Sequence, residues 1–175
     1  GVWETGSLSA EQTMDEDNKG MIVFTDLHGQ KILERRFSGT DKYNDTYFVY
    51  NDYGLLSYVL TPMFQNEKSL GKYAYKYLYD TQNRLISKCL PGCEPIRYWY
   101  DDEDRLVFVQ DNELQIKGKC RFMFYDVKGR VVLQGLCSNQ PSNWLSGIAI
   151  TQIKGLFDTG FSNPSTLQLV SPEFE

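Results

Sequence analysis

Histidine is nearly absent from this chain, because its 175 residues include only His28. A Ser-His-Asp triad needs a histidine as its general base, and His28 lies at a turn position in a sequence without a G-x-S-x-G motif. The chain also lacks a cationic excess, since 18 Lys and Arg stand against 23 Asp and Glu. A protein that follows a nucleic-acid backbone needs a basic stripe. These absences argue against a serine hydrolase and against a nucleic-acid partner.

Cysteine is also scarce, and long apolar runs are missing. The four cysteines show neither the paired C-x-x-C spacing of a zinc site nor the density of a disulfide scaffold. We therefore expect free thiols, with one bridge left open. No apolar run approaches the roughly 20 residues that span a bilayer. We predict no membrane insertion of this segment and no cofactor. The four cysteines are Cys89, Cys93, Cys120 and Cys137.

Aromatic residues are abundant, with 12 Tyr and 10 Phe. Tyrosine and phenylalanine fit a pleated, half-buried surface, so this composition favours strands. The length fits one ordinary domain with a core of its own. We predict a mainly β fold.

A seven-residue unit recurs along the chain at irregular spacings of 11 to 29 residues. Its second position is always Asp or Asn, which favour the first position of a type I turn. Its fifth position is always Gly, Asn or Asp, the residues that best accept positive φ. Each unit therefore predicts the tip of a β-hairpin closed by a left-handed residue. The six copies are "MDEDNKG" from Met14, "TDLHGQK" from Thr25, "YNDYGLL" from Tyr50, "YDTQNRL" from Tyr79, "YDDEDRL" from Tyr100 and "YDVKGRV" from Tyr125.

The turn assigns a structural role to the repeated polar residues. An arginine at the sixth position would lie opposite the aspartate at the second, and each exposed pair contributes about 0–1 kcal/mol. The predicted turn residues are Gly29, Gly54, Asp80, Asn83, Arg84, Asp101, Asp104, Arg105, Asp126, Gly129 and Arg130, with Asp15 opposite Lys19 in the degenerate copy. Counting outward from the turn predicts cross-strand pairs. These are Tyr50 with Leu56, Tyr79 with Leu85, Tyr100 with Leu106, Tyr98 with Phe108, Trp99 with Val107, Tyr125 with Val131 and Met123 with Leu133.

The spacers between units are expected to be loops and strand entries. "LPGCEP" (90–95) predicts a tight turn, and "FSGTDKYND" (37–45) predicts a polar loop. After Cys137 the repeat stops, and helical spacing from 143 to 154 predicts one short helix. We therefore divide the chain into a hairpin region (1–137) and a helix with strands that continue the sheet (138–175), all in one domain of a larger protein.

The pattern Y-x-Y-D-x-x-G-R-L at irregular spacing resembles the YD repeat of the RHS (rearrangement hot spot) family over residues 14–136. The stretches "YAYKYLYD", "NRLISKCLPGCEPI" and "YDDEDRLVFVQD" look closest to large RHS-type proteins of Bacteroidetes. The resemblance implies hairpins laid side by side in a curved sheet, which in bacterial toxin complexes and teneurins winds into a hollow shell. Such shells enclose or present a C-terminal effector, and their repeats are not catalytic.

Three alternative sites can be weighed against that structural role. Four adjacent acids, Asp101 to Asp104, would suit a glycosidase, but acids at a hairpin tip are expected to face water without a raised pKa. "DEDNKG" (15–20) partly matches a calcium loop, but Lys19 stands where an oxygen ligand is needed. Aromatic residues could stack on a sugar, although regular spacing favours packing. The candidate platform is Tyr98, Trp99, Tyr100 and Trp144, with Tyr75, Tyr77 and Tyr79 alongside.

We therefore predict a structural and interaction module without catalysis, an arc of a YD-repeat β-shell from a larger secreted or cell-surface protein. Its expected partners are the rest of the parent chain and an enclosed C-terminal domain or a glycan. A carbohydrate-binding module is the first alternative. A glycoside hydrolase is the second, and it would need two carboxylates facing each other at about 5–10 Å, which this sequence does not require.

Overall fold

The computed structural model of the chain describes residues 4–16, 20–39 and 42–137. Its strands follow one another through the sheet in chain order, and their pairings are antiparallel. This arrangement confirms the predicted mainly β fold of successive hairpins. The strands are β1 (Leu8–Met14), β2 (Gly20–Asp26), β3 (Lys31–Gly39), β4 (Lys42–Tyr50), β5 (Leu56–Leu60), β6 (Ala74–Tyr79), β7 (Leu85–Cys89), β8 (Ile96–Tyr100), β9 (Leu106–Gln110), β10 (Cys120–Tyr125) and β11 (Val131–Cys137).

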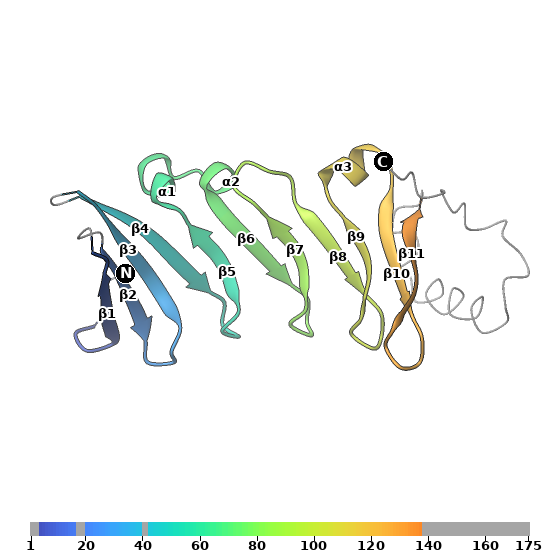
Figure 1. Cartoon of the computed structure of the whole chain (residues 1–175), viewed down its shortest axis with the longest axis horizontal. Coiled ribbons are helices and arrows are strands. Elements are labelled where there is room, and N and C mark those ends of the chain that lie inside the picture. The colour runs from blue at the N-terminus through green and yellow to red at the C-terminus, as the bar shows by residue number, and fades with distance from the viewer. Residues whose placement is uncertain (1–3, 17–19, 40–41, 138–175) are drawn as a thin grey trace, which may run out of the picture. The chain divides into compact units, whose positions relative to one another are not determined.

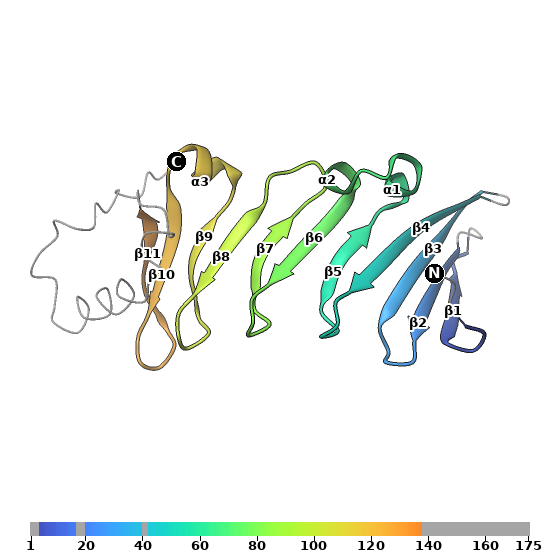
Figure 2. The same cartoon turned by 180° about the vertical axis from the view of Figure 1, so that it is seen from behind.

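The described residues fall into two compact units. The first comprises residues up to 78 together with 88–93, and the second comprises 79–87 and the residues from 94 onward. In the first unit, the turns after β2 and β4 lie at the opposite end of the strands from α1 and α2 (Figure 1). In the second unit, the turns after β8 and β10 lie opposite α3 (Figure 2). Within each unit these turns therefore lie at the end of the strands opposite the helical spacers.

In three hairpins the first strand pair next to the turn agrees with the prediction, and the pair Tyr79 with Leu85 stays a prediction. Tyr50 pairs with Leu56, Tyr100 with Leu106 and Tyr125 with Val131. Beyond this pair the register shifts by one residue in four hairpins, namely β2/β3, β4/β5, β8/β9 and β10/β11. A β-bulge therefore follows the turn at the same distance each time.

The bulge makes three predicted pairs wrong. Phe108 lies opposite Trp99 rather than Tyr98, and Val107 is the extra residue with no partner of its own. Leu133 lies opposite Phe124, and Met123 pairs with Gln134. Counting from the turn assumed one residue for one residue, whereas the second strand of each of these four hairpins carries one more.

The bulge also shapes the core of the second unit. Alternation along a regular strand would place Val107 and Phe108 on opposite faces, yet these neighbours are only 4% and 3% exposed. They belong to one buried cluster with Cys120, Phe122 and Cys137. Partly buried side chains that pack against this cluster are Trp99, Phe124, Tyr125 and Leu133.

A glycine makes room for the more deeply buried of the two phenylalanines in this cluster. Phe122 is 1% exposed and lies opposite Gly135 in the ladder. A Cβ at Gly135 would come within 3.1 Å of the Phe122 ring. A larger residue at this position would therefore push against the core.

Three short helices occupy spacers in which we predicted only loops and strand entries. They are α1 (Pro62–Glu67), α2 (Leu70–Tyr73) and α3 (Asn112–Ile116). The first begins at a proline, which suits the first turn of a helix. The third is capped by Asp111, whose carboxylate accepts a hydrogen bond from the amide of Leu114 at 2.9 Å. Among the described residues, none of these helices has the length and apolarity to cross a membrane.

The predicted polar loop at 37–45 is wrong, because β3 and β4 continue through most of it. Phe37 pairs with Tyr43 in the ladder, and their rings meet edge to face at 5.3 Å. Arg35 and Asp45 form a bidentate ion pair with contacts of 2.8 and 2.7 Å. The polar residues that suggested a loop therefore stabilise a strand pair instead.

Some predictions concern residues outside those described. These are the helix at 143–154, the rest of the 138–175 region, Trp144, and the pairing of Asp15 with Lys19. They remain predictions.

Candidate functional site

The repeated turn has the same hydrogen-bond pattern in five hairpins. The side-chain Oδ1 of the second residue accepts hydrogen bonds from the amides two and four residues later, at 2.8–3.0 Å. Its backbone amide also donates to the carbonyl four residues later, which closes the loop. The five residues are Asp26, Asn51, Asp80, Asp101 and Asp126. An Asp or Asn at this position is therefore explained by the turn itself.

The fifth residue of each turn has positive φ, as predicted. Asn83 and Asp104 have φ of 64° and 61°, and glycines take this position in the other three turns with φ of 75° to 80°. Asparagine and aspartate tolerate this region better than other residues with a Cβ. These two positions therefore keep the turn without a glycine.

Three turns add an ion pair between the second and sixth residues. The Nε of Arg84, Arg105 and Arg130 donates to the aspartate four residues earlier at 2.7, 2.8 and 2.7 Å. The pairs differ in exposure, since the Arg84 and Arg105 side chains are 24% and 22% exposed and that of Arg130 is 74% exposed. The first two are therefore held within the sheet, and the third faces solvent.

Asp101 departs from the expectation that the acids of this turn face water. It is 7% exposed. Burial acts to raise its pKa, but hydrogen bonds from the Arg105 side chain and from the amides of Arg105 and Glu103 outweigh burial and lower the pKa. Asp101 is therefore a carboxylate held in its ionised form.

The arginines also reach the next hairpin. Arg84 Nη1 donates to the carbonyl of Asp101 at 3.1 Å and to the carboxylate of Asp104 at 2.7 Å, and its guanidinium lies 5.1 Å from the Tyr100 ring. Arg105 Nη1 likewise donates to the carbonyl of Asp126 at 3.3 Å, and its guanidinium lies 5.3 Å from the Tyr125 ring. Each guanidinium therefore joins two consecutive turns.

Glutamine takes the same role in the first unit. Gln30 occupies the sixth position of its turn, and its Nε2 donates to the carbonyl of Gly54 in the next turn at 3.0 Å. The contact is neutral, so it lacks the charge that strengthens the arginine contacts.

The tyrosine at the first position makes the return contact. The hydroxyl groups of Tyr50, Tyr100 and Tyr125 donate to carbonyls of the preceding hairpin at 3.0, 2.9 and 2.9 Å. The acceptors are Lys31, Leu85 and Leu106, each the seventh residue of its unit. We call the two contacts together the hairpin link: a tyrosine hydroxyl donates backward, and a sixth-position side chain donates forward. Sequence reasoning found the tyrosines and arginines but missed the link, because their acceptors are backbone carbonyls.

The aromatic residues considered for sugar binding do not share one surface. Successive residues of a strand point to opposite faces, so Trp99 lies on the other side of β8 from Tyr98 and Tyr100. Trp99 packs against the buried cluster, and the hydroxyl of Tyr100 is engaged in the link. Burial raises the pKa of Tyr98.

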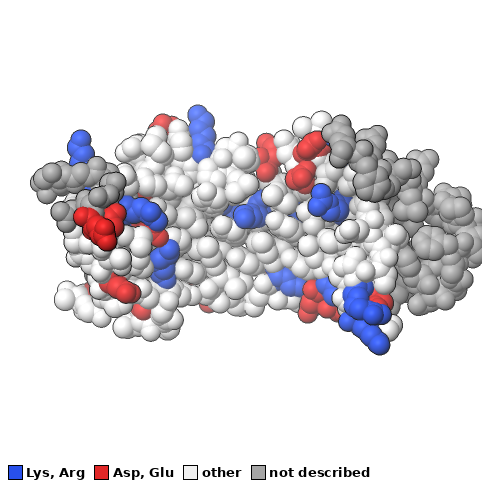
Figure 3. Space-filling view, in the orientation of Figure 1, with Lys and Arg blue, Asp and Glu red and all other residues white. Residues whose placement is uncertain are grey.

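Three of the four acids of the 101–104 turn are engaged in ion pairs rather than converging on a cleft. Asp101 and Glu103 both contact Arg105 at 2.7 Å, and Asp104 contacts Arg84 at 2.7 Å. Acidic and basic groups lie next to one another at the turn end of β8–β11 (Figure 3). Within the described part of the chain, no group of three or more His, Cys, Asp or Glu residues could hold a metal ion.

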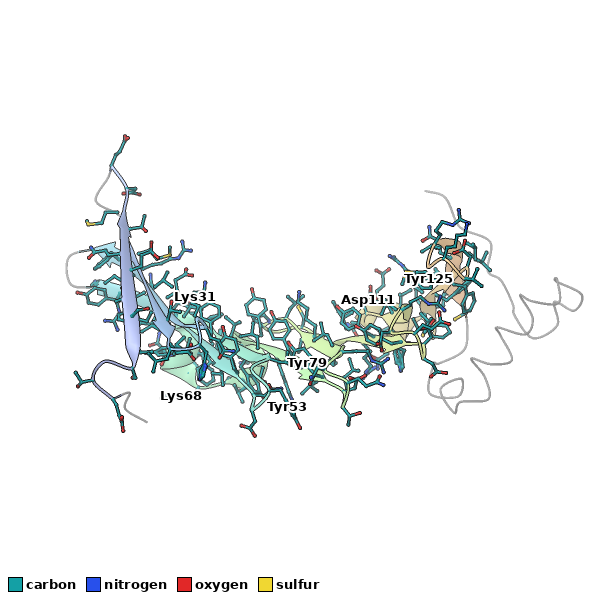
Figure 4. The ribbon with its side chains drawn as sticks, turned by 90° about the horizontal axis from the view of Figure 1, so that it is seen from below. Lys31, Tyr53, Lys68, Tyr79, Asp111 and Tyr125 are labelled. Carbon is teal, nitrogen blue, oxygen red and sulfur yellow. The ribbon has the colours of Figure 1, made fainter. Side chains whose placement is uncertain are left out.

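Some turn side chains take no part in this network. Tyr53, in the turn of Asn51, is 78% exposed and projects away from the strands (Figure 4). The residues at the same fourth position of the other turns are His28, Gln82, Glu103 and Lys128, of which Glu103 also contacts Arg105 at 2.7 Å. Their variety agrees with the backbone pattern, which uses only the amides at these positions.

Comparison with known proteins supports the fold. No family model matches the sequence, and no curated protein matches it. Among solved structures, the chain is similar to the crystal structure of TcdB2-TccC3-TEV, with a TM-score of 0.55 and 14% sequence identity. The match covers 69% of this chain and 6% of that chain. The likeness at this identity concerns the fold alone.

Proposed function

We propose that this chain is a non-catalytic wall segment, an arc of a β-shell built from Y-D hairpins in a larger RHS-type protein. The observation that carries the proposal is the hairpin link, because it engages the residues of the repeat that could otherwise do chemistry. Tyrosine hydroxyls and guanidinium groups donate to neighbouring backbone carbonyls, and the aspartates accept from turn amides.

The charge state of the aspartates supports a structural role. A general acid at neutral pH needs a carboxyl group with a raised pKa. The pKa values of Asp80, Asp101 and Asp126 are all lowered. These groups therefore suit permanent ion pairing and not proton transfer.

The direction of the link supports growth into a wall. The hairpin of Asp101 donates backward through Tyr100 and forward through Arg105, so units of this kind can be added side by side without a new kind of contact. Repeat proteins gain stability from such nearest-neighbour interfaces. In this proposal the parent protein is secreted or displayed at the cell surface, is of the Bacteroidetes RHS type, and encloses or presents a C-terminal effector.

The test is electron cryomicroscopy of the full-length protein that contains this segment. We expect the segment to appear as consecutive hairpins of a continuous β-wall around an internal space. A segment tethered by a flexible linker, outside any wall, would overturn the proposal. Limited proteolysis gives an independent measure, since an enclosed effector should resist cleavage until Arg84→Gln and Arg105→Gln together weaken the wall.

Glycan binding is the competing function, and a glycan array discriminates it. Binding that is abolished by Tyr98→Ala while circular dichroism remains unchanged would favour a carbohydrate-binding module. Trp99→Ala is a less suitable variant for this purpose, because Trp99 packs against the buried cluster and its loss also weakens the fold.

A further inference from the structure

Two buried thiols face each other across the last hairpin of the second unit. Cys120 begins β10 and Cys137 ends β11, and the two are directly opposite in the antiparallel register. Residues in that relation have Cα atoms about 4.5–5.5 Å apart. A disulfide needs a Cα separation of about 4.4–6.8 Å. The backbone of this hairpin therefore already provides the spacing of a cross-strand disulfide.

The two sulfurs are buried and make hydrogen bonds with identified partners. Cys120 and Cys137 are 0% and 4% exposed and belong to the buried cluster. A hydrogen bond between the two thiols, together with burial, raises the pKa of Cys120. Gln110, which is also buried, donates from Nε2 to the Cys120 sulfur at 3.3 Å. The two sulfurs are thus directed at one another.

The other two cysteines lack this arrangement. Cys89 and Cys93 flank a tight turn closed by a hydrogen bond from the amide of Cys93 to the carbonyl of Leu90. The Cys89 thiol donates to the carbonyl of Cys93 at 3.1 Å, and Cys93 is exposed. This turn is the competing site for oxidation.

We propose that Cys120 and Cys137 form an intramolecular disulfide when the chain folds in the presence of a small-molecule disulfide such as oxidised glutathione. The thiolate of one cysteine attacks a sulfur of the glutathione disulfide and releases one glutathione thiol. The thiolate of the second cysteine then attacks the first cysteine's sulfur in the mixed disulfide and releases the second glutathione. The two cysteines lose two electrons and two protons, and glutathione disulfide is reduced to two thiols.

The timing of the reaction follows from burial. The attacking species is the thiolate, and burial with a raised pKa leaves little of it in the folded hairpin. The bond should therefore form during folding, while the strands are still open. A chain that has already folded in its reduced form should oxidise at least tenfold more slowly than a chain refolding in the same buffer.

The experiment isolates this pair in a Cys89→Ser, Cys93→Ser background. The chain is unfolded in urea with reductant and refolded with either oxidised or reduced glutathione. We expect the oxidised sample to lose both titratable thiols, to lose the mass of two hydrogen atoms, and to carry no glutathione adduct. Its urea midpoint should rise, and dithiothreitol should reverse the rise.

Two controls keep the result interpretable. Cys120→Ser and Cys137→Ser in the same background should each abolish the shift in urea midpoint under oxidised glutathione. Peptide mapping of the unmutated chain, refolded in the same way, should recover a linked peptide containing Cys120 and Cys137. The proposal is overturned if both thiols stay free, if the bond joins two chains, or if mapping finds only a Cys89–Cys93 link.

Discussion

The turns of Asn51 and Asp101 share a backbone but differ in side-chain chemistry. Both side chains accept hydrogen bonds from the amides two and four residues later, at 2.9–3.0 Å. The sixth residue is Leu55 in one turn and Arg105 in the other. The side chain of Leu55 has no hydrogen-bond donor. The side chain of Arg105 pairs with Asp101 and reaches the carbonyl of Asp126. The turn therefore needs only a side-chain oxygen and a residue that accepts positive φ, and the arginine serves the contact between hairpins.

Gln30 stands between these two cases. It donates forward to the carbonyl of Gly54 but carries no charge and makes no ion pair with Asp26. The sixth position thus ranges from no forward contact at Leu55, through a neutral contact at Gln30, to a charged contact at Arg105. The comparison predicts which changes affect the turn and which affect only the link.

Acid should have the largest effect, because it titrates several turns at once. The pKa values of Asp80, Asp101 and Asp126 are lowered. Burial opposes this at Asp80 and Asp101, and hydrogen bonds from turn amides and arginines outweigh it. Groups with a lowered folded pKa contribute stability that is complete above the unfolded pKa of about 3.9 and is lost as pH falls through the folded pKa. Urea midpoints measured from about pH 6 down to about pH 2.5 should fall steeply below about pH 4.

The control for the acid prediction is Asp101→Asn, which makes this turn resemble that of Asn51. The variant should be less stable at neutral pH but should show a shallower loss of stability in acid. A steep acid transition unchanged by Asp101→Asn would contradict a role for this carboxylate.

Asp101→Ala should cost about 3 kcal/mol of unfolding free energy, because it removes the acceptor of two turn amides and the buried carboxylate that pairs with Arg105. Asn51→Ala removes the same two amide contacts from a neutral turn and should cost about 1 kcal/mol. Chemical denaturation of both variants measures the difference. Equal losses would show that the ion pair contributes nothing beyond the turn.

Gly129→Val should cost about 2 kcal/mol through strain alone, since φ is 76° and no atom lies within 4 Å of a new Cβ. Gly54→Val should cost more, because its Cβ would also come within 3.1 Å of Gln30 Nε2 and disturb the forward contact. Thermal unfolding of both variants ranks them. A Gly54→Val variant as stable as wild type would contradict the positive-φ requirement of the turn.

Arg105→Gln should cost about 1–2 kcal/mol, because Arg105 is largely enclosed and contacts Asp101, Asp126 and the Tyr125 ring. Arg130→Gln makes the same change at a side chain that is 74% exposed, and we expect no measurable loss. Urea denaturation of the matched pair gives the result. Similar losses for the two variants would show that the arginine acts within its own turn rather than between hairpins.

The hairpins and their turns could be predicted from the sequence because the turn is a local structure. The Asp or Asn at the second position and the Gly, Asn or Asp at the fifth satisfy needs of the same few backbone groups. The pair next to the turn, such as Tyr100 with Leu106, follows directly. The pairing of Trp99 with Phe108 does not, because nothing in the residue types around Val107 identifies the extra residue.

The link and the spacers were harder to predict, for different reasons. The acceptors of Arg84 and Tyr100 are main-chain carbonyls of another hairpin, which every residue possesses, so the sequence does not distinguish them. The helix α3 carried a local signal, since Asp111 can cap the amide of Leu114. At 37–45, the hydrophilic composition concealed a strand pair that is held by an ion pair and an aromatic contact on its faces.

Because each of these hairpins contains a bulge at a fixed distance from its turn, such a chain can change length more easily by whole hairpins than by single residues. Inserting one residue between turn and ladder would move every later side chain of that strand to the opposite face. Duplicating or deleting a complete hairpin would add or remove its turn, its extra residue and its link donors together. The new neighbours would meet the same carbonyls as before. Genetic variation in this chain is therefore expected to conserve the number of residues between each turn and its strands, while the number of hairpins and the length of the spacers vary.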